Sequence, residues 1–370
     1  MSHPDAMAAR AADRARVVAI AAEIDQFEQR IRALQVEQDF FQHRLDAYEY
    51  PVLTLPNEIV SEIFIHFLPT YPHCPPMKGR ESPTTLTHIC RRWHEIALAT
   101  PKLWRAIAVF YTQKRTKQTR LVQTWLNRSG SCPLSIRLGP SDLVSKEAFL
   151  AILLHSERWH HVELGMPAPE VALIKGPMPL LESFSLEVDR SDYTHPATTF
   201  GDFPRLRSLT LDNAGDARWL PISQLTTLTF QDVHHLTNCL PLLRDAVNLV
   251  HLSLIDCTIV PPQSNNITLT RVQTFAMIQC LAGPHMLDIL TLPALCTLRM
   301  PAGGLGLDPI NSLTSFISRS GCKLQKVVFT RPVHRSEKSL LAAFPTIPHF
   351  QIKDDVYSMH SQSEAEDDSD

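Results

Sequence analysis

Histidine and cysteine are the side chains best able to bind a metal ion or act as a nucleophile, and in this chain they form no recognised motif. The closest cysteines, such as Cys74 and Cys90, are 16 residues apart, so there is no C-x-x-C pair of the kind that holds zinc. His160 and His161 are adjacent in an expected strand, where successive side chains point to opposite faces. We therefore expect them to be a poor ligand pair, and we expect no metal site.

Motifs for phosphate binding and for hydrolysis are missing as well. Glycine makes up only 12 of the 370 residues, which argues against enzymes built on phosphate-binding loops. The run from Gly303 to Gly306 lacks the second glycine pair and the following helix with lysine that such a loop needs. There is no G-x-S-x-G, no H-E-x-x-H and no kinase motif set. We therefore expect a non-enzymatic protein with no catalytic residue and no cofactor; an enzyme with dispersed catalytic residues is the alternative.

Composition and charge describe a folded chain that favours no polyanionic partner. Hydrophobic residues make up 44% and charged residues 20%, enough for a sizeable core. The formal net charge of -3 gives no reason to expect nucleic acid as a partner. The start does not resemble a signal peptide, and no apolar run reaches the roughly 18 residues that a membrane helix needs. We expect a protein of the cytoplasm, the nucleus or both, with its cysteines as thiols and no membrane association.

The elements that would position functional residues begin with a long helix over residues 1–50. Apolar residues recur there at alternating steps of three and four, and the series ends before Pro51. They are Val17, Ile20, Ile24, Phe27, Ile31, Leu34, Phe41, Leu45 and Tyr48. The spacing predicts either an amphipathic helix lying on its own domain or a coiled coil, with a homodimer through residues 17–48 as one outcome.

Residues 51–108 read as a small all-helical block. Pro56 suits the first turn of a helix that continues to Pro69, and a proline-rich loop follows. Ser82 is the expected N-cap of a second helix, which carries Leu86, Ile89, Cys90, Trp93 and Ile96 on one face and ends at Thr100.

This block resembles the F-box. The resemblance lies in L-P-x-E-I-x-x-x-I-F, then L-x-x-I-C-R-R-W-x-x-I-A, then P-x-L-W, in that order over about 50 residues. The layout of heptad helix and F-box also resembles F-box proteins of mushroom-forming fungi. The resemblance implies binding to the Skp-type adaptor of a cullin–RING ubiquitin ligase. We expect the adaptor-binding residues to be Leu55, Pro56, Ile59, Ile63, Cys90 and Trp93.

The loop between residues 69 and 82 is longer than in a compact F-box. For Trp93 core packing is an equal alternative, and for Trp104 core packing is our interpretation.

A basic segment and an acidic tail flank the second half of the chain. No acidic residue lies between Glu95 and Asp142, whereas eight lysines and arginines do. We interpret residues 109–132 as a basic linker helix, with a solvated face or an acidic partner as the two alternatives. Residues 356–370 are acidic and polar, and we expect them to be disordered.

Residues 133–355 carry a repeated pattern of an apolar residue, a second three positions on, and a third two positions further. The repeats start at Trp159, Leu181, Leu206, Leu225, Leu249, Val272, Leu295 and Leu324. This spacing resembles the L-x-x-L-x-L strand of leucine-rich repeats, whose period is about 20–29 residues. Cys257 and Cys280 stand eight residues after their repeat starts, and we interpret them as buried core thiols. The alternative is a plain α/β or β-rich domain with chance spacing.

If these repeats stack, the alternate residues of each strand form an exposed face. Small hydroxyl residues dominate it, acids lie early, cations lie late, and two isoleucines stand between them. We expect the target-binding residues to be Glu163, Glu187, Asp212, His251, Ile255, Ile278, Arg299 and Lys326. The alternative is an ordinary solvated sheet face.

The sequence as a whole predicts an α+β multidomain protein: an N-terminal helix, a small all-α F-box and an α/β leucine-rich-repeat-like solenoid. Our first hypothesis is a substrate-recruiting subunit of a Skp–cullin–F-box ubiquitin ligase, with a protein target that the sequence does not identify. The second is a scaffold outside any ligase that dimerises through its N-terminal helix.

Overall fold

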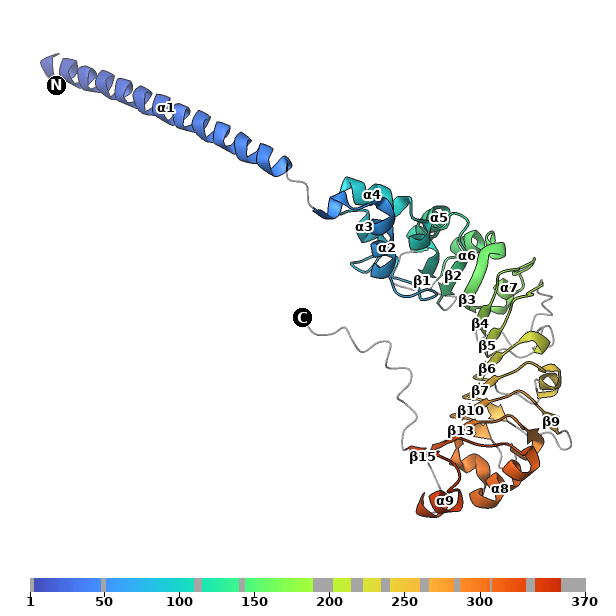
Figure 1. The fold of residues 1–370 in the computed structure, drawn as a ribbon. Coiled ribbons are helices and arrows are strands. Elements are labelled where there is room, and N and C mark those ends of the chain that lie inside the picture. Colours follow the sequence, from blue (N-terminus) through green and yellow to red (C-terminus); the bar gives the residue numbers. More distant parts are fainter. Residues whose placement is uncertain are drawn as a thin grey trace. The chain divides into compact units, whose positions relative to one another are not determined.

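The computed structural model is an α+β protein with a long N-terminal helix and an 11-stranded parallel sheet accompanied by helices (Figure 1). The chain forms two compact units, Met1–Val60 and Ser61–Asp370. The structure describes residues 3–47, 51–109, 115–139, 144–188, 202–213, 222–233, 240–259, 266–282, 287–306, 308–330 and 337–353. The expected disordered tail, 356–370, lies outside these ranges.

The first unit consists mainly of helix α1, His3–Asp46, followed by a 3-10 turn, Pro51–Thr54. The helix starts earlier than the heptad pattern does, since no glycine or proline interrupts residues 5–46. The described side chains of the pattern are 40% to 70% exposed in this single chain. Tyr48 lies outside the described residues. The structure therefore leaves the apolar stripe of α1 uncovered within its own unit.

Helix α2, Asn57–Phe67, confirms the first helix that the sequence predicts after Pro56. The second predicted helix is wrong in its extent. It forms two pieces, α3, Pro83–Leu86, and α4, Arg91–Leu98. Threonine explains the break, because the Thr87 hydroxyl donates to the Thr84 carbonyl oxygen at 2.6 Å and so competes with the helical bonding pattern. Cys90 becomes the N-cap of α4 rather than a residue within a helix.

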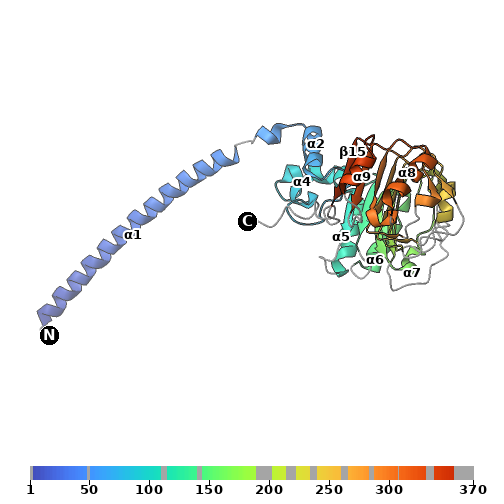
Figure 2. The same cartoon turned by 90° about the horizontal axis from the view of Figure 1, so that it is seen from below.

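The second unit is built on parallel strands that follow one another through the chain (Figures 1 and 2). The sheet order is β1 (Ala106–Val109), β2 (Leu134–Leu138), β3 (Trp159–Met166), β4 (Ser183–Val188), β5 (Ser208–Asp212), β6 (Thr227–Gln231), β7 (His251–Ile255), β10 (Thr274–Ile278), β13 (Thr297–Pro301), β14 (Lys326–Thr330) and β15 (His349–Lys353). The connections carry α5 (Arg115–Arg128), α6 (Lys146–Leu153), α7 (Ala168–Val171), α8 (Pro309–Ser320) and α9 (Glu337–Ala343). Two further pairs join β8 (Thr258–Ile259) to β11 (Leu281–Ala282) and β9 (Ile267–Thr268) to β12 (Leu290–Thr291).

The repeated apolar positions align across this sheet. Phe184 pairs in register with Leu209, and the row continues through Leu228, Leu252, Phe275, Leu298 and Val327. Every residue of this row is at most 1% exposed. A single short strand could not bury such a residue, but a stack of in-register strands covers each one with its neighbours.

A residue in the left-handed conformation follows four of the central strands. These residues are Asn213, Asp232, Asp256 and Gln279, with φ between 51° and 54°. The Asp232 N–H donates to the Ile255 carbonyl oxygen, and the Asp256 N–H donates to that of Ile278, both at 2.9 Å. Asparagine and aspartate tolerate this conformation better than most residues. The chain therefore turns out of each strand at a fixed position while remaining bonded to the next.

The start of the second half differs from the expected domain boundaries. Residues 106–109 form strand β1 of the sheet, so the predicted F-box range of 51–108 extends into it. Helix α5, within the predicted linker 109–132, packs its buried Trp125 edge-on against Trp104 at a centroid distance of 5.3 Å. The Trp104 indole N–H also donates to the Ala97 carbonyl oxygen at 2.9 Å. The basic segment is therefore part of a continuous core, which agrees with the core interpretation of Trp104.

The two cysteines at the repeat position are buried thiols, as predicted. The Cys257 Sγ donates to the Phe230 carbonyl oxygen at 3.4 Å, and the Cys280 Sγ donates to that of Leu254 at 3.3 Å. Every described cysteine is a free thiol. None of the helices in the described ranges has the length and apolar character needed to cross a bilayer.

Candidate functional site

Helix α2 exposes apolar side chains along one side. Ile59, Ile63 and Phe67 stand one turn apart and are 49%, 48% and 44% exposed. Phe64, on another side of the helix, is 1% exposed and packs edge-on against Trp93 at 5.0 Å. An exposed apolar stripe of this kind is typical of a surface that binds another chain.

The other predicted adaptor residues differ in exposure. Pro56 is exposed and Leu55 is half-buried just before α2. Cys90 is half-buried, and its Sγ accepts the Trp93 N–H at 3.5 Å as the cap of α4. Trp93 is half-buried against Phe64, and no acceptor for its indole N–H is found among the described residues. Cys90 and Trp93 therefore have local structural roles, whereas Pro56 and the α2 isoleucines are open to a partner.

The second surface is the polar face of the sheet, which we define as the alternate side chains that point away from the buried row. Glu187, Asp212, Gln231, Ile255 and Ile278 pair successively in register and so form a row on this face. Ile255 and Ile278 are half-buried. Gln231 connects them to the acidic residues, since it pairs with Asp212 on one side and with Ile255 on the other. The Gln231 amide donates to the Asp212 carboxylate at 2.8 Å. The predicted acids and isoleucines thus share one face.

The remaining predicted target residues lie on the same face. Arg299 continues a parallel row through Ala276 of β10, and His251 and Lys326 are exposed at the first positions of their strands. The expected gradient of charge is incomplete at its acidic end. The Arg137 guanidinium forms an ion pair with the Glu163 carboxylate, and both side chains are about half exposed. The repeat pattern does not predict Arg137 as a residue of this face, because the pattern is degenerate at strand β2.

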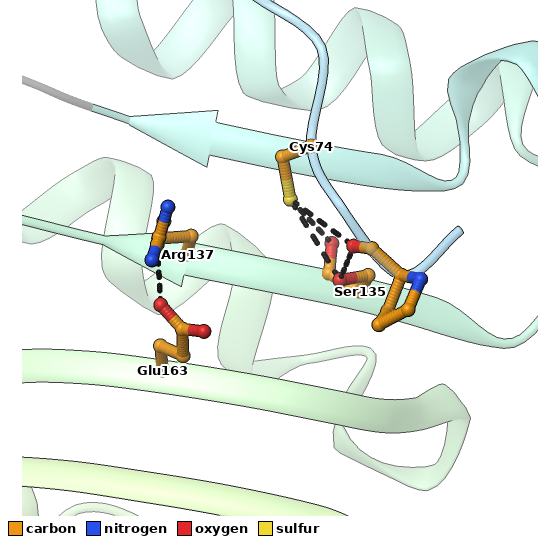
Figure 3. A network of polar contacts seen from close by, with 5 residues as sticks. Cys74, Ser135, Arg137 and Glu163 are labelled. Atoms are coloured by element: carbon orange, nitrogen blue, oxygen red, sulfur yellow. Dashed lines mark hydrogen bonds and ion pairs between the residues drawn. The ribbon is translucent and has the colours of Figure 1, made fainter. Parts of the chain in front are cut away.

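The loop between α2 and α3 crosses the start of this face. The Ser135 hydroxyl on β2 donates to the Pro72 carbonyl oxygen at 2.6 Å, and the Cys74 Sγ lies 3.7 Å from the Ser135 Oγ (Figure 3). The Arg105 guanidinium stacks 3.9 Å from the centre of the Tyr71 ring. The loop between residues 69 and 82 is therefore fixed to the sheet.

A small open hollow of about 150 Å³ lies beside these contacts. It is lined by Pro72, His73, Cys74, Ser135, Ile136, Arg137, His161, Val162, Glu163 and Ser183. Its size suits a side chain of a bound protein rather than a drug-sized molecule. Burial raises the pKa of the Cys74 thiol to about 11, so the group is a weak nucleophile at neutral pH.

His160 and His161 lie side by side, which contradicts the expectation that they point to opposite faces. Strand β3 carries a bulge there: Leu134 of β2 pairs with Trp159, but the next residue, Ser135, pairs with His161. The extra residue places both imidazoles on one side, with ring centroids 4.3 Å apart. The His160 Nε2 lies 3.3 Å from the Glu182 carboxylate. Among the residues that the structure describes, these three side chains form the one group close enough to hold a metal ion.

The comparisons with known proteins do not identify the chain. Neither a protein-family model nor a curated protein matches it.

Proposed function

We propose that this protein is an F-box subunit that recruits a protein target to a Skp–cullin–F-box ubiquitin ligase. The observation that carries the proposal is the exposed apolar stripe of α2, in which Ile59 and Ile63 belong to the F-box pattern. The stack of in-register strands has a long polar face, and we propose that this face binds the target. The subunit would join two proteins and would make or break no bond itself.

The proposed binding of the adaptor rests on the apolar surface of α2 that a partner would bury. Ile59 and Ile63 are each about half exposed. Covering the remaining surface of one isoleucine contributes about 2 kcal/mol, or about thirtyfold in affinity. Leu55 and Pro56 precede this stripe directly and belong to the same sequence pattern.

Co-purification with the Skp-type adaptor tests this side. We expect the wild-type chain to retain the adaptor and the double variant Leu55→Ala with Pro56→Ala to lose it while staying folded. Glu62→Ala, at an exposed polar position of α2, is the matched control and should retain the adaptor. Failure of the wild-type chain to bind, or equal retention by the double variant, would contradict the proposal.

The target side rests on the two isoleucines of the polar face. They are register neighbours between acids on one side and Arg299 and Lys326 on the other. Central apolar residues commonly supply most of the binding energy, while flanking charges set orientation. Ile255→Asp with Ile278→Asp should release targets captured under proteasome inhibition, while the adaptor remains bound.

One observation favours a second function, dimerisation through α1. The heptad side chains of α1 are uncovered in the single chain, and apolar residues repeated in this way pair two helices. A scaffold that dimerises through this helix without entering a ligase would retain no adaptor in the same experiment.

A further inference from the structure

His160, His161 and Glu182 form a compact group of potential metal ligands at the first strands of the sheet. One ligand atom from each side chain lies within 4.8 Å of those of the other two. All three side chains are half-buried rather than fully solvated. Two imidazole nitrogens and one carboxylate oxygen are a donor set typical of zinc.

The spacing of one pair already suits a shared ion. Bonds of about 2.0–2.1 Å at tetrahedral angles place two ligand atoms about 3.3 Å apart. The His160 Nε2 and the Glu182 Oε1 are 3.3 Å apart. The third ligand, His161, is the next residue along the bulge, and its side chain also lines the small hollow.

The surroundings of the His160 imidazole also suit metal binding. The His160 Nδ1 lies 3.0 Å from the Tyr71 hydroxyl oxygen, which can accept its hydrogen. In that tautomer the Nε2 lone pair faces the Glu182 carboxylate, as a shared metal ion requires, whereas without an ion the other tautomer donates its Nε2 hydrogen to Glu182.

We propose that His160, His161 and Glu182 bind one divalent zinc-type ion, with Tyr71 orienting the His160 ring through its Nδ1. Water completes the coordination. The ion joins strand β3 to the residue just before β4 and, through Tyr71, to the loop between α2 and α3. This proposal does not depend on the ligase function.

Titration of the full-length chain with zinc, followed by calorimetry, tests the site, and cobalt absorption reports the ligand type. We expect one equivalent to bind, and a cobalt spectrum of nitrogen and oxygen ligands without a thiolate band. Glu182→Gln, which keeps the shape of the side chain, and His161→Ala should each abolish this binding. Tyr71→Phe should weaken it by about 10–100-fold, as expected for a partner that orients a ligand.

His251→Ala removes an exposed histidine of the same face and is the matched control, and Cys74→Ser tests the nearest loop thiol. Neither should change zinc affinity. No binding by the wild-type chain, a thiolate band in the cobalt spectrum, or unchanged affinity in Glu182→Gln would overturn the proposal. Circular dichroism of each variant separates loss of the site from loss of the fold, and Glu182→Gln keeps the test decisive if His161→Ala unfolds.

Discussion

Replacing Leu252 with aspartate is the most direct test of the stacked sheet. Leu252 is fully buried in the centre of the apolar row, in register with Leu228 and Phe275, which are fully buried as well. Its neighbour Ser253 is half-buried and points to the polar face. The same charge placed one residue apart should therefore have very different effects.

The magnitude has two parts. Truncating a buried leucine costs about 2–5 kcal/mol. An aspartate in this row must also become neutral, and protonating a carboxyl group of pKa about 3.9 at pH 7 costs about 4 kcal/mol. The sum of about 6–9 kcal/mol is comparable to the whole stability of an ordinary domain, about 5–15 kcal/mol. Leu252→Asp should therefore lose cooperative folding of the sheet at pH 7.

The second part depends on pH with a definite sign. Burial raises the pKa of the introduced carboxyl group above its unfolded value, so the folded state binds its proton more tightly. The penalty is thus small below about pH 4 and grows as pH rises toward 7. Leu252→Asn cannot ionise. It should therefore show only the cost of truncating the buried leucine, and this cost should not change with pH.

Urea unfolding, followed by circular dichroism at about pH 4 and at pH 7, measures these effects. Ser253→Asp is the matched control, and its free energy of unfolding should stay within about 1 kcal/mol of wild type. If Leu252→Asp and Ser253→Asp unfold at similar urea concentrations, the assignment of the two faces is wrong.

Two further predictions concern the loop and the N-terminal helix. At pH 8 a thiol of pKa 9.0 is about 9% thiolate, whereas one of pKa about 11, as for Cys74, is about 0.1% thiolate. Iodoacetamide should therefore label Cys74 about 90-fold more slowly in the folded chain than in urea, with the rate rising between pH 9 and 11; equal rates by mass spectrometry would show that the thiol is not buried. Antiparallel pairing of α1 would place Arg16 opposite Glu37, so Arg16→Cys should crosslink to a Glu37→Cys partner, and efficient crosslinking of Arg16→Cys to its own copy would contradict it.

The sequence predicts the central sheet well because a stack of strands repeats one physical requirement. Each unit needs three buried apolar residues at fixed positions, and the spacing from Leu181 to Leu324 therefore reveals the strands directly. Strand β1 lacks this spacing, so the sequence does not predict it. Residues 106–109 are buried throughout, so they show no alternation between apolar and polar residues.

The errors fall where side chains alter the backbone locally. Hydrogen bonds from Thr87 and its neighbours end α3 early, and helical periodicity carries no signal for them. The bulge at His160 depends on pairing with β2, which is distant in sequence, so alternation along β3 alone gives the wrong face. The left-handed residues after the strands could have been predicted from the sequence. Two aspartates and an asparagine recur there, each directly after a residue of the polar face.

The irregular features gather in one place, and this has a physical reason. Along the regular rows, side chains at equivalent positions are held apart by the strand spacing, so they present a bland ladder of serine and threonine. The largest convergence of titratable side chains among the described residues lies where the repetition fails. At the bulge of β3, under the loop between α2 and α3, His160, His161 and Glu182 come together beside Tyr71. The departures from the repeat, which weaken its recognition, are thus what can create a binding site.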